Sequence, residues 1–148
     1  MKKIILHIFF LFSLSLFSQN TETVLNTKWQ FHQKGKETWF PAKVPGNVHN
    51  DLLTNKQIAD PFYGDNEKKA QWIENEEWEY KTEFTCDKKT FSQNHIELEF
   101  EGLDTYAKVY LNETLILEAD NMFRSWNVDV KKNIKEEVII YALSSNPL

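Results

Sequence analysis

Apolar and charged residues alternate with a period of two in several parts of this chain. The clearest case is residues 78–84, WEYKTEF, in which every second residue from Trp78 to Phe84 is aromatic or a threonine, and Glu, Lys and Glu stand between them. Successive side chains of a β-strand point to opposite faces, so the pattern predicts a strand with one buried and one solvated face. Residues 95–100, HIELEF, repeat it. Such segments must bury their apolar faces against another layer.

Seven segments in all have strand character. Residues 105–120 predict a hairpin that turns at Asn112-Glu113. Pro41 predicts a sheet edge for residues 39–44, because proline cannot donate a ladder hydrogen bond. The remaining segments are residues 29–33, 125–130 and 136–145. We therefore predict an all-β fold, a β-sandwich of the jelly-roll type.

A single region has helical character. Asn47 can cap a helix that begins at Val48, and the apolar spacing continues to Leu52 and Leu53 before ending near Lys56. The Asp60-Pro61 pair stops any longer helix, since proline disfavours the α conformation of the residue before it. We expect one short helix near residues 47–56.

The first 18 residues predict an export signal. Lys2 and Lys3 precede an apolar run at residues 4–17, and Ser18 is a small residue before a possible cleavage point. The run is short for a transmembrane helix, although an uncleaved anchor is the alternative. We expect residues 1–18 to be removed and the protein to be periplasmic or secreted. Residues 19–148 are then one N-terminal β-sandwich domain, which we expect to be truncated at its C-terminal end.

Composition excludes several classes of protein. A net charge of -5 without a basic stripe argues against a nucleic-acid-binding protein. Cys86 is the single cysteine, so no intramolecular disulfide can form, and we predict a buried, inert thiol. Neither His nor Cys occurs at the spacing of zinc ligands. We expect no metal and no cofactor.

Five blocks of the sequence carry a resemblance to a known family. They are WFPAKVPGNVHNDLL, DPFYGDNE, QWIENEEWEYKTEF, EGLDTYAKVYLNE and DNMFRSWNVDV, which together extend from about Asn26 to Leu143. In this order they resemble the N-terminal, sugar-binding jelly-roll domain of β-mannosidases in glycoside hydrolase family 2. The resemblance implies a fold like that of galactose-binding domains. The first three blocks favour the mannosidase branch over β-galactosidases and β-glucuronidases.

The resemblance also implies a multidomain parent enzyme. Family members remove terminal β-linked mannose with retention, using two glutamates of a TIM barrel. That barrel, and the Trp-Asp-Trp-Gly segment that closes the first domain, lie outside this sequence. Asn-Glu pairs, which match the family's acid/base dipeptide, occur at Asn66-Glu67, Asn75-Glu76 and Asn112-Glu113. None stands in a barrel strand, so we assign no catalytic residue.

We therefore expect this stretch to be an inactive accessory domain of an exported exo-β-mannosidase. Its partners would be the parent's β-mannoside oligosaccharide and the catalytic barrel of the same chain, with no nucleic acid and no membrane after signal cleavage. One alternative is a free-standing carbohydrate-binding module. Another is the same domain of a β-galactosidase or β-glucuronidase.

Residues 60–72 combine the kinds of side chain that a sugar pocket needs, namely hydroxyl acceptors, an amide and aromatic faces. The candidates are Asp60, Tyr63, Asn66, Glu67 and Trp72. By the resemblance, this loop borders the pocket for the terminal mannose. In the alternative, Asp60 and Asn66 hold the loop together by side chain to backbone bonds, with Phe62 and Tyr63 packed beneath it.

Histidines and tryptophans give further expectations. His49 is predicted to contact the loop backbone or the neighbouring barrel rather than to transfer protons. His32 and His95 lie in strand patterns and are expected to be exposed. The tryptophans with strand periodicity are predicted to pack in the core or against another domain, and they are Trp29, Trp78 and Trp126.

Overall fold

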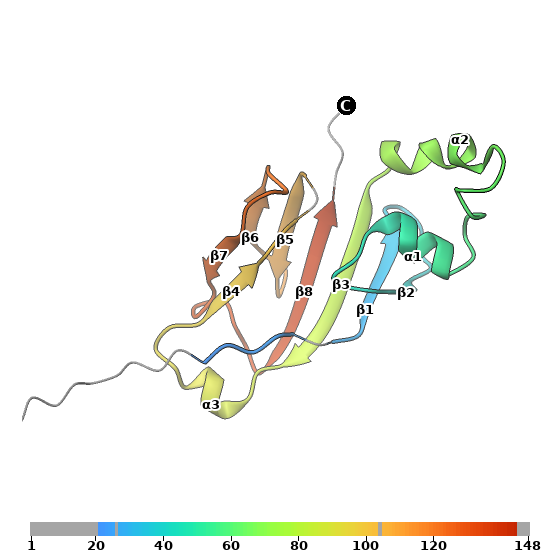
Figure 1. Ribbon diagram of the computed structural model, residues 1–148. Helices are drawn as coiled ribbons and strands as arrows, with labels where there is room; N and C mark the ends of the chain where they lie inside the picture. Colours follow the sequence, from blue (N-terminus) through green and yellow to red (C-terminus); the bar gives the residue numbers. More distant parts are fainter. Residues whose placement is uncertain (1–20, 26, 104, 145–148) are drawn as a thin grey trace, which may run out of the picture.

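The structure, a computed structural model, describes residues 21–25, 27–103 and 105–144. Within these ranges, strands form two antiparallel sheets that face one another (Figure 1). The larger sheet has the order β2-β1-β3-β8-β5-β6, and the smaller sheet pairs β4 with β7. The strands are β1 (Trp29–Gln33), β2 (Phe40–Ala42), β3 (Trp78–Thr85), β4 (Glu97–Phe100), β5 (Ala107–Leu111), β6 (Thr114–Ala119), β7 (Trp126–Asp129) and β8 (Glu137–Ser144). The predicted all-β sandwich is confirmed.

Two local features of the sheets agree with the predictions made from the sequence. Strand β2, which contains Pro41, lies at an edge of the larger sheet, as predicted. Asn112 and Glu113 make the β5–β6 turn with φ angles of 47° and 69°. Two consecutive positive φ angles give the turn whose twist matches that of the paired strands.

Short helices accompany the sheets, and the predicted one is present. Helix α1 (Val48–Thr54) begins after Asn47, whose side chain accepts a hydrogen bond from Asn50 N at 2.9 Å. The sequence did not predict the other helices of the described ranges. They are α2 (Asn66–Ala70), the 3₁₀ helix η1 (Gln71–Asn75) and α3 (Lys88–Phe91).

These additional helices have little apolar periodicity. In α2 and η1 the buried residues are Ala70 and Ile73, three positions apart in a polar segment. Helix α3 is a single turn, in which the Asp87 side chain accepts a hydrogen bond from Thr90 N at 2.6 Å. That hydrogen bond also holds the pKa of the Asp87 carboxyl below its usual range.

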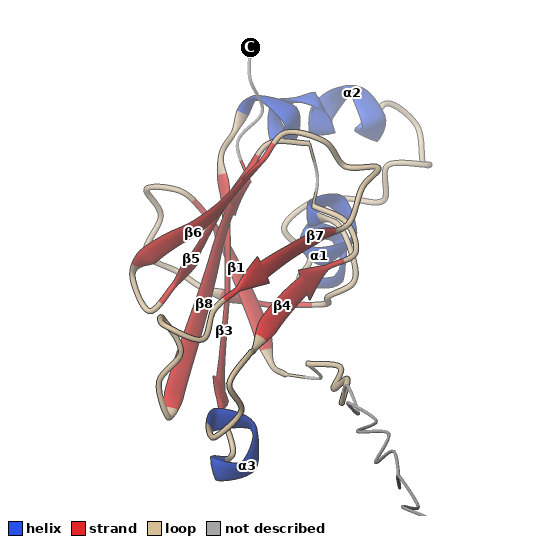
Figure 2. Ribbon diagram, turned by 90° about the vertical axis from the view of Figure 1, so that its left-hand side faces the viewer, coloured by secondary structure: helices blue, strands red, loops and turns tan. Residues whose placement is uncertain are grey.

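Five strands of the larger sheet are level at one end. Gln33 is in register with Trp78, Trp78 with Ser144, Ser144 with Ala107, and Ala107 with Ala119. We call this the upper end of the domain, because it is uppermost in Figures 1 and 2. Helix α2 lies at the upper end and α3 at the lower end (Figure 2).

The apolar face of the larger sheet carries two clusters. The sandwich core, beneath β4 and β7, has as its buried residues Cys86, Val109, Leu111, Val130, Ile134, Val138 and Ile140. The helix-side core, beneath α1 and η1, has as its buried residues Phe31, Leu52, Ala70, Ile73 and Trp78. Strand β3 serves both, since Trp78 belongs to the helix-side core and Phe84 packs on the sandwich core.

Other predictions about buried side chains can be compared with the structure. Trp78 is buried, whereas Trp29 and Trp126 are half-buried. The Cys86 thiol is buried as predicted, and burial raises its pKa, which disfavours the reactive thiolate.

No described helix has both the length and the apolar character needed to cross a bilayer. The predicted signal segment, residues 1–18, lies outside the described residues.

Candidate functional site

Helix α1, which precedes the candidate loop, is anchored by a buried carboxylate, Asp51, which is 4% exposed. Its Oδ1 accepts a hydrogen bond from Lys43 N at 2.9 Å, and its Oδ2 accepts one from the Tyr80 hydroxyl at 3.0 Å. Asp51 therefore joins the exit of β2, helix α1 and strand β3. The sequence analysis did not identify this residue, although Asp51 follows Val48 by three positions and so faces the sheet with it.

Two further features fix the entry and exit of α1. A Cβ atom on Gly46 would overlap the carbonyl oxygen of Lys43, so the turn before the helix requires glycine. At the other end, Asn55 Nδ2 donates to the carbonyl oxygen of Pro41 at 2.8 Å. His49 is half-buried in α1, and no hydrogen bond of its imidazole is found within the described residues. Its predicted contact with the loop or a barrel stays a prediction.

The loop between α1 and α2 is held by hydrogen bonds of Asp60 and Asn66. Asp60 Oδ1 accepts from Phe62 N at 3.0 Å, while the Asp60 carbonyl oxygen accepts from Tyr63 N at 3.2 Å and from Asn66 Nδ2 at 2.9 Å. Gly64 has a φ of 61°, a conformation that glycine adopts without strain. These are the loop bonds that the alternative interpretation predicted, so the loop is pre-organised by its own side chains.

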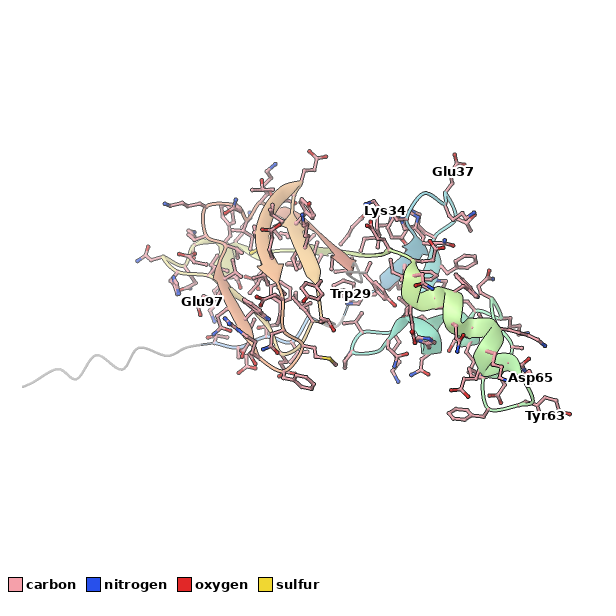
Figure 3. All side chains as sticks on the ribbon, turned by 90° about the horizontal axis from the view of Figure 1, so that it is seen from above. Trp29, Lys34, Glu37, Tyr63, Asp65 and Glu97 are labelled. Atoms are coloured by element: carbon pink, nitrogen blue, oxygen red, sulfur yellow. The ribbon has the colours of Figure 1, made fainter. Side chains whose placement is uncertain are left out.

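The rings of Phe62 and Tyr63 do not pack beneath this loop. They are 99% and 79% exposed, so the prediction that they lie under it is wrong. Viewed from above, Tyr63 and Asp65 lie at the outer margin of the domain (Figure 3).

A hollow of about 210 Å³ lies beside this loop. It is enclosed by residues 57–59 and by part of the helical segment, and its walls include Asn66 and Trp72. Trp72 is 40% exposed, and its ring lies 5.9 Å from that of Trp78. The structure thus brings Asn66 and Trp72 together at one hollow, whereas Asp60, Tyr63 and Glu67 are not on its walls.

A larger hollow, of about 610 Å³, lies away from the candidate loop. It is lined by residues 27–30 at the start of β1, by Pro41 and Ala42, and by residues 81–83 of β3. None of the predicted site residues is among them. Size alone would select this hollow, but two of the predicted site residues, Asn66 and Trp72, line the smaller one.

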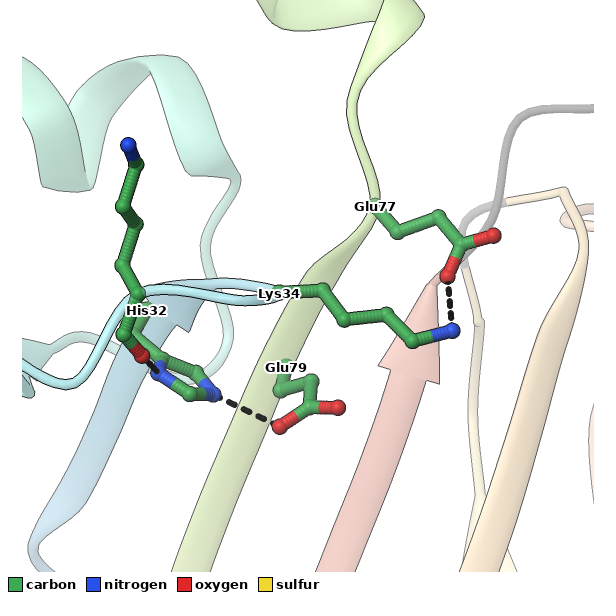
Figure 4. A network of polar contacts seen from close by, with 5 residues as sticks. His32, Lys34, Glu77 and Glu79 are labelled. Carbon is green, nitrogen blue, oxygen red and sulfur yellow. Dashed lines mark hydrogen bonds and ion pairs between the residues drawn. The ribbon is translucent and has the colours of Figure 1, made fainter.

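His32 is buried, at 8% exposed, so the prediction that it is exposed is wrong. Its Nε2 lies 2.6 Å from Glu79 Oε2, and its Nδ1 lies 2.6 Å from the carbonyl oxygen of Lys36 (Figure 4). The imidazole also stacks on Trp39, with ring centroids 3.8 Å apart. The β1–β2 loop folds back over the sheet and covers the ring, which a strand pattern cannot reveal.

An ion pair between Lys34 and Glu77 adjoins this histidine (Figure 4). The hydrogen bond that the Lys34 ammonium donates to the Glu77 carboxylate raises the pKa of Lys34. Both side chains are about half exposed, so the pair adds little stability. These contacts fasten the β1–β2 loop to β3. His95, by contrast, has a side chain that is 63% exposed, as predicted.

The described ranges contain no group of three or more His, Cys, Asp or Glu residues placed to hold a metal ion.

Residues 29–146 match the glycosyl hydrolase 2 galactose-binding domain-like family. The chain belongs to this family. A curated relative, beta-mannosidase B of Aspergillus terreus, is 41% identical over 112 residues. The match covers 73% of this chain but only 13% of that relative.

Two solved structures illustrate what this domain is similar to. The β-D-mannosidase of Dictyoglomus thermophilum superimposes with a TM-score of 0.81 and is 42% identical, with 83% of this chain and 15% of that chain covered. The exo-chitosanase of Amycolatopsis orientalis has a TM-score of 0.71 at 20% identity, covering 87% of this chain and 17% of that chain, and shows the fold alone. The resemblance to the first domain of β-mannosidases is confirmed.

Proposed function

We propose that this family domain is the non-catalytic N-terminal domain of an exported exo-β-mannosidase that removes terminal β-linked mannose with retention. The supporting observation is an identity of 41–42% with β-mannosidases both in sequence and in structure comparisons. Identity is 17% with a β-D-glucuronidase and 20% with an exo-chitosanase of the same fold. The matched region is about one seventh of each β-mannosidase, which leaves room for separate catalytic domains.

Retention requires a nucleophile and an acid/base carboxylate roughly 5–5.5 Å apart. In the proposed parent both belong to the catalytic barrel. Of the Asn-Glu pairs in this chain, Asn112-Glu113 is the β5–β6 turn, and Glu67 lies exposed in the first turn of α2. Neither has the buried surroundings by which proteins tune a catalytic acid.

The contribution of this domain would be a wall of the mannose pocket. The loop is already fixed by its internal hydrogen bonds, so binding a sugar there would order few additional torsions. Tyr63 and Glu67 are exposed, and no side-chain hydrogen bond of either is found in the described part of the chain. Their oxygens are therefore available to the hydroxyls of a substrate. The exposed face of Trp72 is suited to C–H groups of the sugar ring.

Kinetics of the full-length parent enzyme test the pocket. Tyr63→Phe removes a hydroxyl, and Glu67→Ala removes a carboxylate, without disturbing the bonds of Asp60 and Asn66 that hold the loop. We expect kcat/KM for an aryl β-mannoside to fall by about five- to tenfold in each, since one hydrogen bond is worth about 1–1.4 kcal/mol. Lys68→Ala, an exposed residue of α2, is the matched control. Unchanged kinetics in both variants would exclude the loop from the pocket.

The 148-residue chain by itself tests the non-catalytic role. We expect no hydrolysis of aryl β-mannosides, and hydrolysis would contradict the proposal. We also expect no saturable change of tryptophan fluorescence with β-mannoside oligosaccharides; such a change would favour a free-standing carbohydrate-binding module. If the parent instead hydrolysed only β-galactosides or β-glucuronides, the alternative substrate class would hold.

Export can be tested on its own. The proposal rests on the charged start and the apolar run of residues 1–18. N-terminal sequencing of protein recovered from the periplasm or medium should begin at Gln19. Recovery only from the cell interior, with Met1 retained, would refute export and leave the enzymatic proposal unaffected.

A further inference from the structure

Both ring nitrogens of His32 lie against oxygen atoms that accept hydrogen bonds and cannot donate them. Nδ1 is 2.6 Å from the carbonyl oxygen of Lys36, and Nε2 is 2.6 Å from Oε2 of Glu79 (Figure 4). A carbonyl oxygen and an ionised carboxylate have no proton to give. A neutral imidazole has one N–H and one lone pair, so it satisfies only one of these contacts. The other contact would then hold a lone pair against an oxygen.

One additional proton satisfies both contacts. Either His32 carries it and donates from both nitrogens, or Glu79 carries it and donates to Nε2 while Nδ1–H is donated to Lys36. In both forms a proton lies between Nε2 and Oε2. His32 and Glu79 therefore gain and lose this proton as a coupled pair.

The surroundings of the ring prevent water from replacing a lost contact. His32 is 8% exposed, and its imidazole stacks on Trp39 with ring centroids 3.8 Å apart. The Lys81 ammonium lies 4.1 Å from the centroid of the Trp39 ring. A buried polar atom that loses its partner is costly. Loss of the shared proton must therefore displace the ring or the loop that covers it.

The segment held by this contact is the β1–β2 loop, residues 34–39. Lys34 N also donates to the carbonyl oxygen of Glu77 at 2.8 Å, and the side chains of these two residues form an ion pair. That pair is about half exposed and adds little stability. The contact of His32 with the Lys36 carbonyl oxygen is the more deeply buried attachment of the loop.

We propose that His32 and Glu79 form a proton-dependent latch that holds the β1–β2 loop against the sheet. The charged groups around the ring are Glu79 and Lys81 of β3 and the Lys34–Glu77 pair. The closed latch holds one proton more than the open loop, so it is favoured at low pH and weakens as pH rises. Histidine side chains typically change charge between about pH 5 and 8. The inference goes beyond the proposed function and does not depend on it.

Trypsin digestion of the full-length parent tests the latch, because Lys34 and Lys36 lie in the loop itself. The readout is cleavage after these two lysines divided by cleavage after Lys88 and Lys89 of α3 in the same digest. This ratio cancels the pH dependence of trypsin. We expect it to rise about tenfold between about pH 5 and 8, as for loss of one charge-assisted hydrogen bond. A ratio that does not change with pH would refute the latch.

Glu79→Gln separates a latch from plain structural support. The amide of this variant can donate an N–H to Nε2 of a neutral imidazole, whose Nδ1–H stays on the Lys36 carbonyl oxygen. The loop then closes without the additional proton, so the cleavage ratio should stay low at every pH. Rapid cleavage of the loop at both ends of the pH range would make Glu79 a structural support only, and the proposal would fail.

Histidine variants complete the test. His32→Gln should abolish the pH dependence of the ratio, and this variant decides the matter if Glu79→Gln does not fold. His95→Gln is the matched control, because the His95 ring also lies beside a glutamate, at 2.9 Å from Glu97 Oε1, but its side chain is 63% exposed. It should keep the pH dependence. A dependence that survives His32→Gln or disappears in His95→Gln would assign it to another group and overturn the proposal.

Discussion

Replacement of Asp51 by alanine should destabilise the domain strongly. The side chain is 4% exposed and accepts two hydrogen bonds, at 2.9 Å from Lys43 N and at 3.0 Å from the Tyr80 hydroxyl. A hydrogen bond to a charged group contributes about 1.5–3 kcal/mol. Lys43 is exposed, so its freed N–H can bind water, and we take the low end for both bonds. The expected loss for Asp51→Ala is about 3 kcal/mol, a large part of a typical domain stability.

Urea unfolding followed by tryptophan fluorescence measures this loss. The midpoint should fall while the slope of the free energy against urea stays constant, because the exposed surface on unfolding is unchanged. Asp51→Asn is the matched control. Its amide oxygen can still accept from Lys43 N while its NH₂ donates to the Tyr80 oxygen, so about 1 kcal/mol should be lost.

A double-mutant cycle with Tyr80→Phe tests whether these bonds are the cause. Tyr80→Phe should destabilise the protein by about 1.5 kcal/mol on its own and by much less in the Asp51→Ala background, since the bond is already absent there. Full additivity, or a change below about 0.5 kcal/mol for Asp51→Ala, would refute the argument.

Further predictions concern other parts of the fold. Glu113→Gly should stabilise the protein by about 1 kcal/mol in urea unfolding, because φ of 69° strains a non-glycine residue; a loss of stability would contradict this. Phe31→Leu should destabilise by about 1–2 kcal/mol, since Phe31 is 0% exposed among three aromatic rings, and an unchanged midpoint would be inconsistent with that packing. The pKa of Asp87 is lowered, so its cap on α3 is complete above the ordinary value and is lost as pH falls through the lowered pKa. An NMR titration of the Asp87 carboxyl should therefore have a midpoint below 3.8, and a higher midpoint would exclude the cap. The Cys86 thiol should react with a disulfide reagent only after urea is added, and rapid native labelling would disprove its burial.

Local signals explain the parts of the fold that the sequence predicted correctly. Pro41 excludes a central strand, and Asn112 favours a tight turn with positive φ. Asn47 caps α1 through a bond to a residue three positions away. Each of these depends on near neighbours in the chain, so the pattern is visible without knowledge of the packing.

The missed features depend on contacts between distant residues. His32 is buried because Trp39 of the β1–β2 loop and the Glu79 carboxylate of β3 lie against its ring. Asp51 accepts a hydrogen bond from Tyr80 of β3, which lies 29 residues later in the chain. The α2–η1 segment shows its apolar side only through Ala70 and Ile73.

For the candidate site, composition singled out residues 60–72 but did not predict how their side chains are arranged, and their role at a sugar pocket stays a prediction. Asn66 and Trp72 share a hollow, whereas Tyr63 points away from the domain. The direction of each side chain depends on the conformation of the loop and of the helices after it, and the order of residue types does not encode that conformation.

The division of the apolar face into two clusters has a consequence for motion. Leu52 and Ile73 are buried in one cluster, and Val109 and Ile140 in the other. Proteins open in cooperative units that follow such boundaries. Amide hydrogens of α1 and η1 would then exchange through a partial opening in which β3 keeps its pairing with β8. The loop that carries Phe62 would detach together with these helices, while β3 and β8 stay paired.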